Sequence, residues 1–95
     1  MHQGQNGTVA EAKHDLAARL RRIEGQVKRL QRMVEDERSC IEIITQVNAV
    51  QSAVRGAALV LLENHLRQCL RSGGNDGERQ IHEVVTAAER LLRSV

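Results

Sequence analysis

Apolar residues recur in the first third of the chain at alternating steps of four and three. They are Leu16, Leu20, Ile23, Val27, Leu30 and Val34. This spacing places them on one face of a helix, in a seam like that of a coiled coil. Thr8 and Glu11 form a capping box, so we expect the helix to begin near residue 9 and to end near residue 36.

A second apolar stripe predicts a long helix that ends near residue 71. Ser39 and the acidic residues before it form the joint between the two helices, because such side chains suit a helix N-terminus. The stripe consists of Cys40, Ile44, Val47, Gln51, Val54, Ala58, Leu61 and His65, with Cys69 one turn further on. Small residues at positions 53 and 56–58 make its middle thin, which allows a neighbouring helix to approach closely.

The segment from Ser72 to Gly77 is rich in glycine and breaks the helical pattern. Asn75 or Asp76 can cap a third helix, whose apolar face is formed by Ile81, Val84, Val85, Ala88, Leu91, Leu92 and Val95. We therefore expect an all-α fold, in which a three-helix protomer carries its short third helix on a long antiparallel hairpin. Residues 1–8 are expected to be a disordered tail, and residues 9–95 a single helical domain.

Composition makes self-association attractive. The chain has 95 residues, no aromatic residue and no proline, so its helices can be long, but a protomer buries little apolar area alone. Its two cysteines do not make a disulfide framework, and we find neither a signal peptide nor an apolar run of ~18 residues. These features predict a cytoplasmic protein without membrane contact.

The candidate metal ligands are Cys40, His65 and Cys69. His65 and Cys69 are four residues apart, so they share one face of the helix and can bind one metal ion. A core histidine beside a core cysteine would give the same spacing, so the pair alone is a weak signal. Cys40 strengthens the metal hypothesis because it lies on the same stripe.

These three ligands cannot meet within one subunit if the second helix is continuous. Cys40 and His65 are 25 residues apart, which corresponds to ~37 Å along a helix. Two antiparallel copies related by a two-fold axis near residues 53–54 would instead place Cys40 of one chain beside His65 and Cys69 of the other, at both ends. The small residues fall at this crossing point. The sequence thus predicts a homodimer with two shared sites.

Two thiolates and one imidazole make a soft, three-coordinate ligand set. Such a set favours Cu(I), whereas zinc normally demands a fourth ligand. The same cysteines could serve a reversible thiol sensor, and a copper-buffering protein would use the same ligands. An enzyme is not expected, because no nucleophile–base pair or phosphate-binding loop is present.

Basic charge is concentrated in residues 13–32, which carry seven basic and two acidic side chains, a net charge of +5, whereas the rest of the chain carries seven and ten, a net charge of −3. Five of the basic residues fall within an arc of ~120° opposite the apolar seam; they are Arg21, Arg22, Lys28, Arg29 and Arg32. This face suggests an anionic partner. Arg19 on its flank, and Gln46 and Arg55 on the second helix, are further candidates for contact with double-stranded DNA.

Three segments resemble the copper-sensitive operon repressor (CsoR/RcnR-like) family, and the similarity covers roughly residues 13–93. The segments are RLRRIEGQVKRL, SCIEIITQVNAVQSAV and ENHLRQC. The spacing Cys–x24–His–x3–Cys matches the copper-sensing branch. The nickel/cobalt branch has His at the position of Cys69, the persulfide-sensing branch lacks His65, and the formaldehyde-responsive branch lacks a Cys at position 69.

The resemblance implies an antiparallel four-helix-bundle dimer and a homotetramer made of two dimers. It also implies a repressor that binds operator DNA when metal-free and is released on Cu(I) binding, with a persulfide or other reactive-species sensor as the alternative within the family. Glu83 matches a glutamate that hydrogen-bonds the metal-bound histidine, although the residues alone would make it an ordinary solvated side chain. Arg19 and Gln46 match family positions linked to DNA binding, whereas Arg55 varies. Ser39 departs from the Tyr of several members.

Overall fold

The computed structural model describes residues 9–72 and 77–93, which form three helices and no strand. They are α1 (Val9–Glu35), α2 (Cys40–Ser72) and α3 (Gly77–Arg93). The predicted all-α fold with three helices is confirmed, and the helix boundaries agree to within about a residue. The expected tail, the Thr8 cap and the cap at Asn75 or Asp76 lie outside the described residues. No helix in these ranges is long and apolar enough to cross a membrane.

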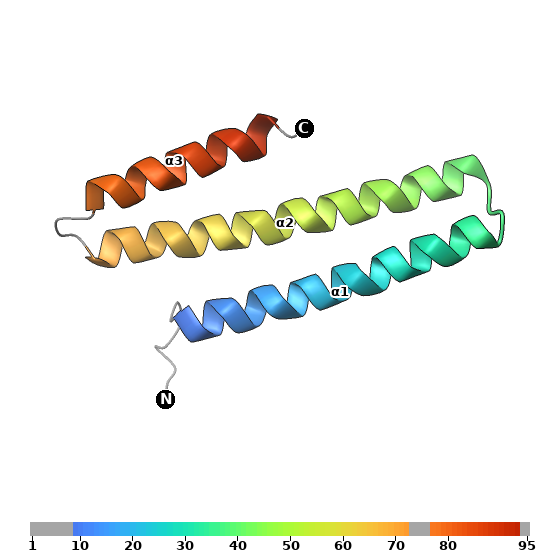
Figure 1. Cartoon of the computed structure of the whole chain (residues 1–95), viewed down its shortest axis with the longest axis horizontal. Coiled ribbons are helices and arrows are strands. Elements are labelled where there is room, and N and C mark those ends of the chain that lie inside the picture. The colour runs from blue at the N-terminus through green and yellow to red at the C-terminus, as the bar shows by residue number, and fades with distance from the viewer. Residues whose placement is uncertain (1–8, 73–76, 94–95) are drawn as a thin grey trace.

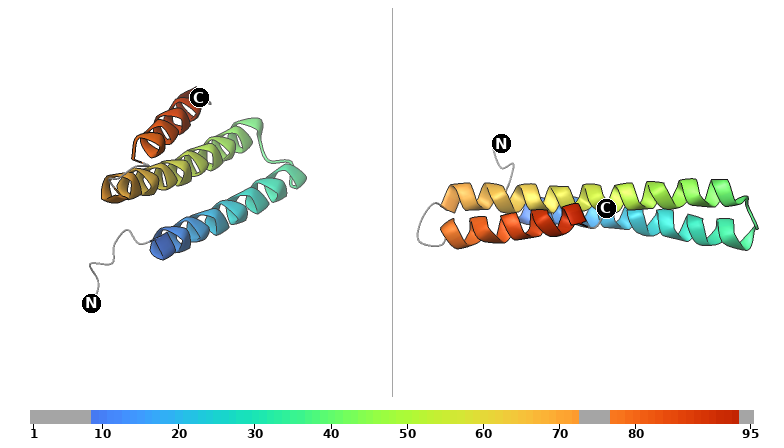
Figure 2. Two further views of the ribbon diagram at one scale, coloured as in Figure 1. Left: turned by 60° about the vertical axis from the view of Figure 1, so that its left-hand side comes forward. Right: turned by 90° about the horizontal axis from the view of Figure 1, so that it is seen from above.

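The three helices lie side by side in a flat layer, with α2 between α1 and α3 (Figure 1). The molecule measures 55 × 36 × 13 Å, so its shortest dimension is about the width of one helix. Seen from above, the layer is thin along its whole length (Figure 2). The radius of gyration is 17.3 Å, whereas a compact domain of this length would have about 12 Å. The protomer therefore encloses almost no core.

Burial confirms this point at the level of single residues. Among the residues whose side chains are described, only Ala57, Cys69 and Val84 are buried. The seam of α1 is divided: Leu16, Ile23 and Leu30 are half-buried, whereas the alternate members Leu20, Val27 and Val34 are 39–56% exposed. On α2, Ile44, Val54 and Leu61 of the predicted stripe are also exposed. We call these six exposed residues the open seam.

A second set of exposed apolar residues lies elsewhere on α2 and on α3. We call it the α2–α3 rows, and it consists of Leu59, Leu66, Leu70, Ile81, Val85 and Leu92, each at least 41% exposed. Leu59 and Leu61 point in nearly opposite directions, because successive helical residues are ~100° apart. On α2, Val54 and Leu61 of the open seam therefore face a different side from Leu59, Leu66 and Leu70.

The joint between α1 and α2 is closed by hydrogen bonds on both sides. At the end of α1, the amide of Arg38 donates to the carbonyl of Met33 (3.0 Å) and that of Glu37 to the carbonyl of Val34 (3.1 Å). This is a Schellman motif, and Glu37 occupies its left-handed position with φ of 56°. The helix thus stops here although no glycine is available.

At the start of α2, Ser39 is the cap that the sequence predicted. The amide of Glu42 donates to Ser39 Oγ, and the amide of Ser39 donates to Glu42 Oε1, both at 3.2 Å, which completes a capping box. Arg38 donates to the same carboxylate through Nη2 at 2.7 Å. The hydrogen bond from Arg38 is the main reason why the pKa of Glu42 falls from 4.5 to about 2.

Candidate metal centre and DNA-binding face

The continuity of α2 separates the expected ligands within one protomer. α2 runs without interruption from Cys40 to Ser72, so Cys40 and His65 stand ~37 Å apart at opposite ends of one rod. Metal–ligand bonds are only ~2–2.3 Å long. Within the ranges that the structure describes, no three His, Cys, Asp or Glu side chains come together to hold a metal ion. The protomer offers two half-sites.

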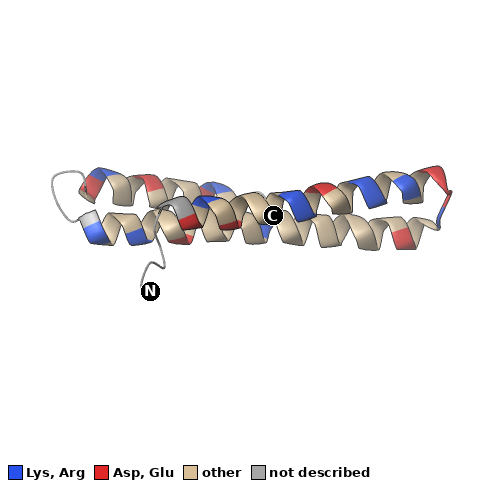
Figure 3. Ribbon diagram, turned by 90° about the horizontal axis from the view of Figure 1, so that it is seen from below, with Lys and Arg blue, Asp and Glu red and all other residues tan. Residues whose placement is uncertain are grey.

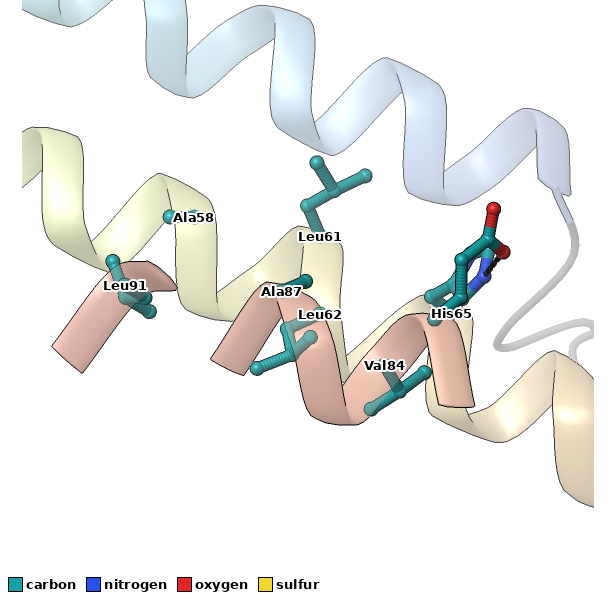
Figure 4. A pocket seen from close by; sticks show the side chains of 8 residues that line it. Ala58, Leu61, Leu62, His65, Val84, Ala87 and Leu91 are labelled. Carbon is teal, nitrogen blue, oxygen red and sulfur yellow. Dashed lines mark hydrogen bonds and ion pairs between the residues drawn. The ribbon is translucent and has the colours of Figure 1, made fainter. Parts of the chain in front are cut away.

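His65 and Cys69 form the larger half-site, on the part of α2 that packs against α3. Cys69 is only 3% exposed, whereas the side chain of His65 is 39% exposed and its Nε2 lies 3.0 Å from Glu83 Oε1 on α3. His65 stands at one end of a hollow of about 300 Å³ between the two helices (Figure 4). Glu83 also lines this hollow, and the other lining side chains are apolar. The structure therefore brings Glu83 to His65.

This contact decides which nitrogen of His65 is free. A carboxylate only accepts hydrogen bonds, so the contact requires the proton on Nε2. In the neutral imidazole the lone pair is then on Nδ1. A histidine held in this way presents one defined nitrogen to a metal, and the carboxylate fixes the plane of the ring. Glu83 itself is exposed, and the side-chain hydrogen bond that the structure describes for it is the one with His65.

Cys40 is the other half-site, and its surroundings differ. It is the first residue of α2 and its thiol is exposed. The free amides at a helix N-terminus favour a negatively charged group such as a thiolate. The capping partners of this end, Arg38 and Glu42, were missed from the sequence. The spacing of Ser39 and Glu42 is that of a capping box, the signal used for Thr8 and Glu11, and could have revealed them.

The chemistry of these residues fits a soft metal ion. Two thiols and one imidazole nitrogen are the donors, and the carboxylate of Glu83 is engaged with the histidine. Thiolates and low coordination numbers suit Cu(I), while nickel and cobalt prefer harder and more numerous donors. One half-site from each of two chains would supply the full set.

The basic face predicted on α1 is open. Arg21, Arg22, Lys28, Arg29 and Arg32 are all exposed, and none forms an ion pair with another described residue. Basic residues recur along α1 in both of its halves (Figure 3). The face is thus a row of free cationic groups, available to phosphates.

The other three candidates for DNA contact, Arg19, Gln46 and Arg55, differ in exposure and in position. Arg19 is half-buried and its Nε lies 3.4 Å from Asp15, beside a polar groove formed with α2. Gln46 is half-buried on α2. Arg55 is exposed but lines a depression together with Leu91 of α3, and α3 lies across α2 from α1 (Figure 1). The protomer therefore does not bring Arg55 to the basic face of α1.

Comparison with known proteins identifies the family. Residues 12–94 match the family model described as metal-sensitive transcriptional repressor. The chain is 38% identical to the copper-sensing transcriptional repressor CsoR of Bacillus subtilis, over 98% of this chain and 94% of that protein. It is 42% identical to the copper-sensing transcriptional repressor RicR of Mycobacterium tuberculosis, over 88% and 92%.

Two solved structures share the fold, each with a TM-score of 0.72. One is the copper-sensing repressor CsoR with Cu(I) from Geobacillus thermodenitrificans, 37% identical over 90% of both chains. The other is the nickel-responsive transcriptional regulator InrS, 31% identical over 82% of this chain and 90% of that one. The fold is thus common to sensors of different metals. On these matches, the chain belongs to the family of metal-sensitive transcriptional repressors.

Proposed function

We propose that this chain is a Cu(I)-responsive repressor that binds operator DNA when metal-free and leaves it when Cu(I) binds. The observation that carries the proposal is the division of the ligands Cys40, His65 and Cys69 between the two ends of one continuous helix. This soft ligand set favours Cu(I) over nickel. The copper-sensing names of the relatives from Bacillus and Mycobacterium support the same choice. Such a repressor acts on DNA in the bacterial cytoplasm.

The open seam supports an antiparallel dimer. Its α2 residues, Ile44, Val54 and Leu61, belong to the stripe that also carries the ligands, so a partner that covers them also meets the ligands. Two α1–α2 hairpins packed in this way make a four-helix bundle. Complete burial of a fully exposed Leu or Val side chain contributes about 1.5–3 kcal/mol. The seam side chains are already about half covered, so each would add roughly half of this to the stability of the dimer.

The α2–α3 rows support a second level of assembly. Their α2 members face a different side of that helix from Val54 and Leu61 of the open seam, so a dimer formed around those two residues leaves them exposed. Apolar surface of this extent is typical of an interface. Two dimers joined through the rows give a tetramer with closed symmetry, and the basic faces of α1 remain outside both contacts.

Different residues of the chain bind the metal and the DNA. The basic face of α1 binds phosphates in the metal-free protein, with Arg19 and Gln46 as additional contacts. Bound Cu(I) joins the thiolates and the imidazole of two chains and so links their α2 helices. Glu83 orients His65 and connects this linkage to α3. The metal and the DNA then act on one assembly, which is the requirement for coupling between two sites.

An anisotropy titration of labelled duplex DNA tests the proposal. The duplex is an operator selected from random DNA on the metal-free protein, and the titration is run without oxygen, with and without Cu(I). We expect Cu(I) to weaken binding by at least ~100-fold, which is about 2.7 kcal/mol of coupling. Ni(II) should have little effect, and Cys40→Ala should abolish the response. Release by Ni(II) but not by Cu(I) would contradict the proposal.

A further inference from the structure

Hydrogen bonds at the start of α2 join residues that flank Cys40 in the sequence. Ser39 and Glu42 donate to each other across it, at 3.2 Å in both directions, and Ser39 Oγ lies at the same distance from Glu42 Oε1. Arg38 holds the carboxylate of Glu42 with two bonds, from Nε at 3.2 Å and from Nη2 at 2.7 Å. We call these three residues the Cys40 clamp.

Nothing else in the described protomer holds Cys40. Its thiol is exposed, and it forms no side-chain hydrogen bond with any residue that the structure describes. His65, by contrast, is held by Glu83 of a second helix, and Cys69 is buried. The order of the Cys40 half-site therefore depends on the first turn of α2, and that turn depends on the clamp.

We infer that Ser39, Glu42 and Arg38 are positioning residues for Cys40, which keep its thiol in place for the metal. The inference rests on the proposed function. The first turn of a helix frays when its free amides have no acceptor, and loss of one cap typically makes the turn about fivefold less stable. A ligand that is ordered for only a fraction of the time lowers the apparent affinity by that fraction.

The clamp also suits the charge of the complete site. Two thiolates and one Cu(I) ion carry a net charge of −1, and the positive end of a helix dipole favours such a charge. Because Ser39 and Glu42 start the helix at Cys40 and not later, the thiolate stands at that positive end. In the shared site, His65 and Cys69 lie near the C-terminal end of α2, which is the negative end of the helix dipole. Of the three ligands, Cys40 is therefore the one at a positive helix end.

The experiment measures Cu(I) affinity of the full-length protein by competition with a coloured chelator, and amide exchange of the metal-free protein by mass spectrometry. Ser39→Ala and Glu42→Ala should each speed exchange at residues 39–43 by about fivefold and weaken Cu(I) binding measurably, by a factor of up to about five. Ser39→Thr, which keeps the hydroxyl cap without adding a charge, should keep both values near those of the parent. Glu42→Gln, which completes the capping box but loses the ion pair with Arg38, should fall between the parent and Glu42→Ala.

Asp15→Asn is the matched control. It removes an exposed ion pair of the same spacing, Arg19–Asp15 at 3.4 Å, at the other end of the hairpin, and should change neither readout. A purely structural clamp would lower the melting temperature of Ser39→Ala and leave its Cu(I) affinity at the parent value, and that result overturns the inference. Unchanged exchange at residues 39–43 overturns it as well, whatever the metal does. A parent that binds no Cu(I) is a different failure, which refutes the proposed function.

Discussion

Mixing two inactive variants gives the sharpest test of the shared site. Cys40→Ala removes one half-site and His65→Ala damages the other, so neither homodimer should hold Cu(I) in its normal three-coordinate site. In a heterodimer of the two, one site combines both lesions and the other is intact. Random exchange of equal amounts makes about half of the dimers heterodimers, so the mixture should recover about 0.25 Cu(I) per subunit, against about one for the parent.

A single chain cannot form the complete site because α2 is too long. With ~37 Å between Cys40 and His65 of one chain and the helix continuous between them, no rotamer change can close the gap. The subunits are mixed in mild denaturant, refolded and titrated with Cu(I) without oxygen against a chelator. The separate variants, treated in the same way, are the control. If the mixture binds no more tightly held Cu(I) than the separate variants do, the cross-subunit geometry is wrong.

Three further predictions concern other parts of the molecule. Glu83→Ala, which removes the 3.0 Å contact to His65, should keep Cu(I) binding but lose most of the ~100-fold coupling to DNA; if the variant still releases DNA like the parent, the route does not pass through Glu83. Arg29→Ala, on the exposed basic face, should weaken DNA binding and reduce the slope of log K against log salt by ~1, and an unchanged slope would exclude a phosphate contact. Glu37→Gly, at φ of 56°, should stabilise the protein by about 1 kcal/mol, since Gly adopts this conformation without strain. Thermal denaturation at fixed protein concentration checks it, with an expected rise of roughly 4–8 °C.

Helical periodicity predicted the elements well because it depends only on the chain itself. The three helices have nearly the bounds expected from the seam of α1, the stripe of α2 and the break after Ser72. The Cys40 and His65 half-sites follow from the same arithmetic, since a continuous helix fixes their separation. Helix bounds and the spacing of residues along a helix are properties of a single helix, so they can be predicted from the sequence alone.

Relations between helices were harder to predict. A helical wheel showed that Leu20 and Ile23 share a face, but not that only Ile23 would be packed within the protomer and Leu20 left exposed. Similarly, the sequence named Arg55 on the second helix as a further candidate for DNA contact, but it could not show that Arg55 lines a depression with Leu91 of α3. The direction in which a neighbour lies is set by tertiary packing, and the periodicity of a single helix carries no information about it.

The proposed dimer explains how one small movement can serve both metal and DNA. If the two α2 helices are related by a two-fold axis, sliding one along the other changes the distance from Cys40 to the partner's half-site equally at both ends. Each α1 is joined to its α2 by a four-residue turn closed by hydrogen bonds, so the two basic faces move with the α2 helices. The register of α2 against α2 therefore sets both the closure of the metal sites and the spacing of the groups that meet phosphates. A metal that fixes the register for three-coordinate binding selects one spacing, and DNA selects another; this is the differential binding that allosteric release requires.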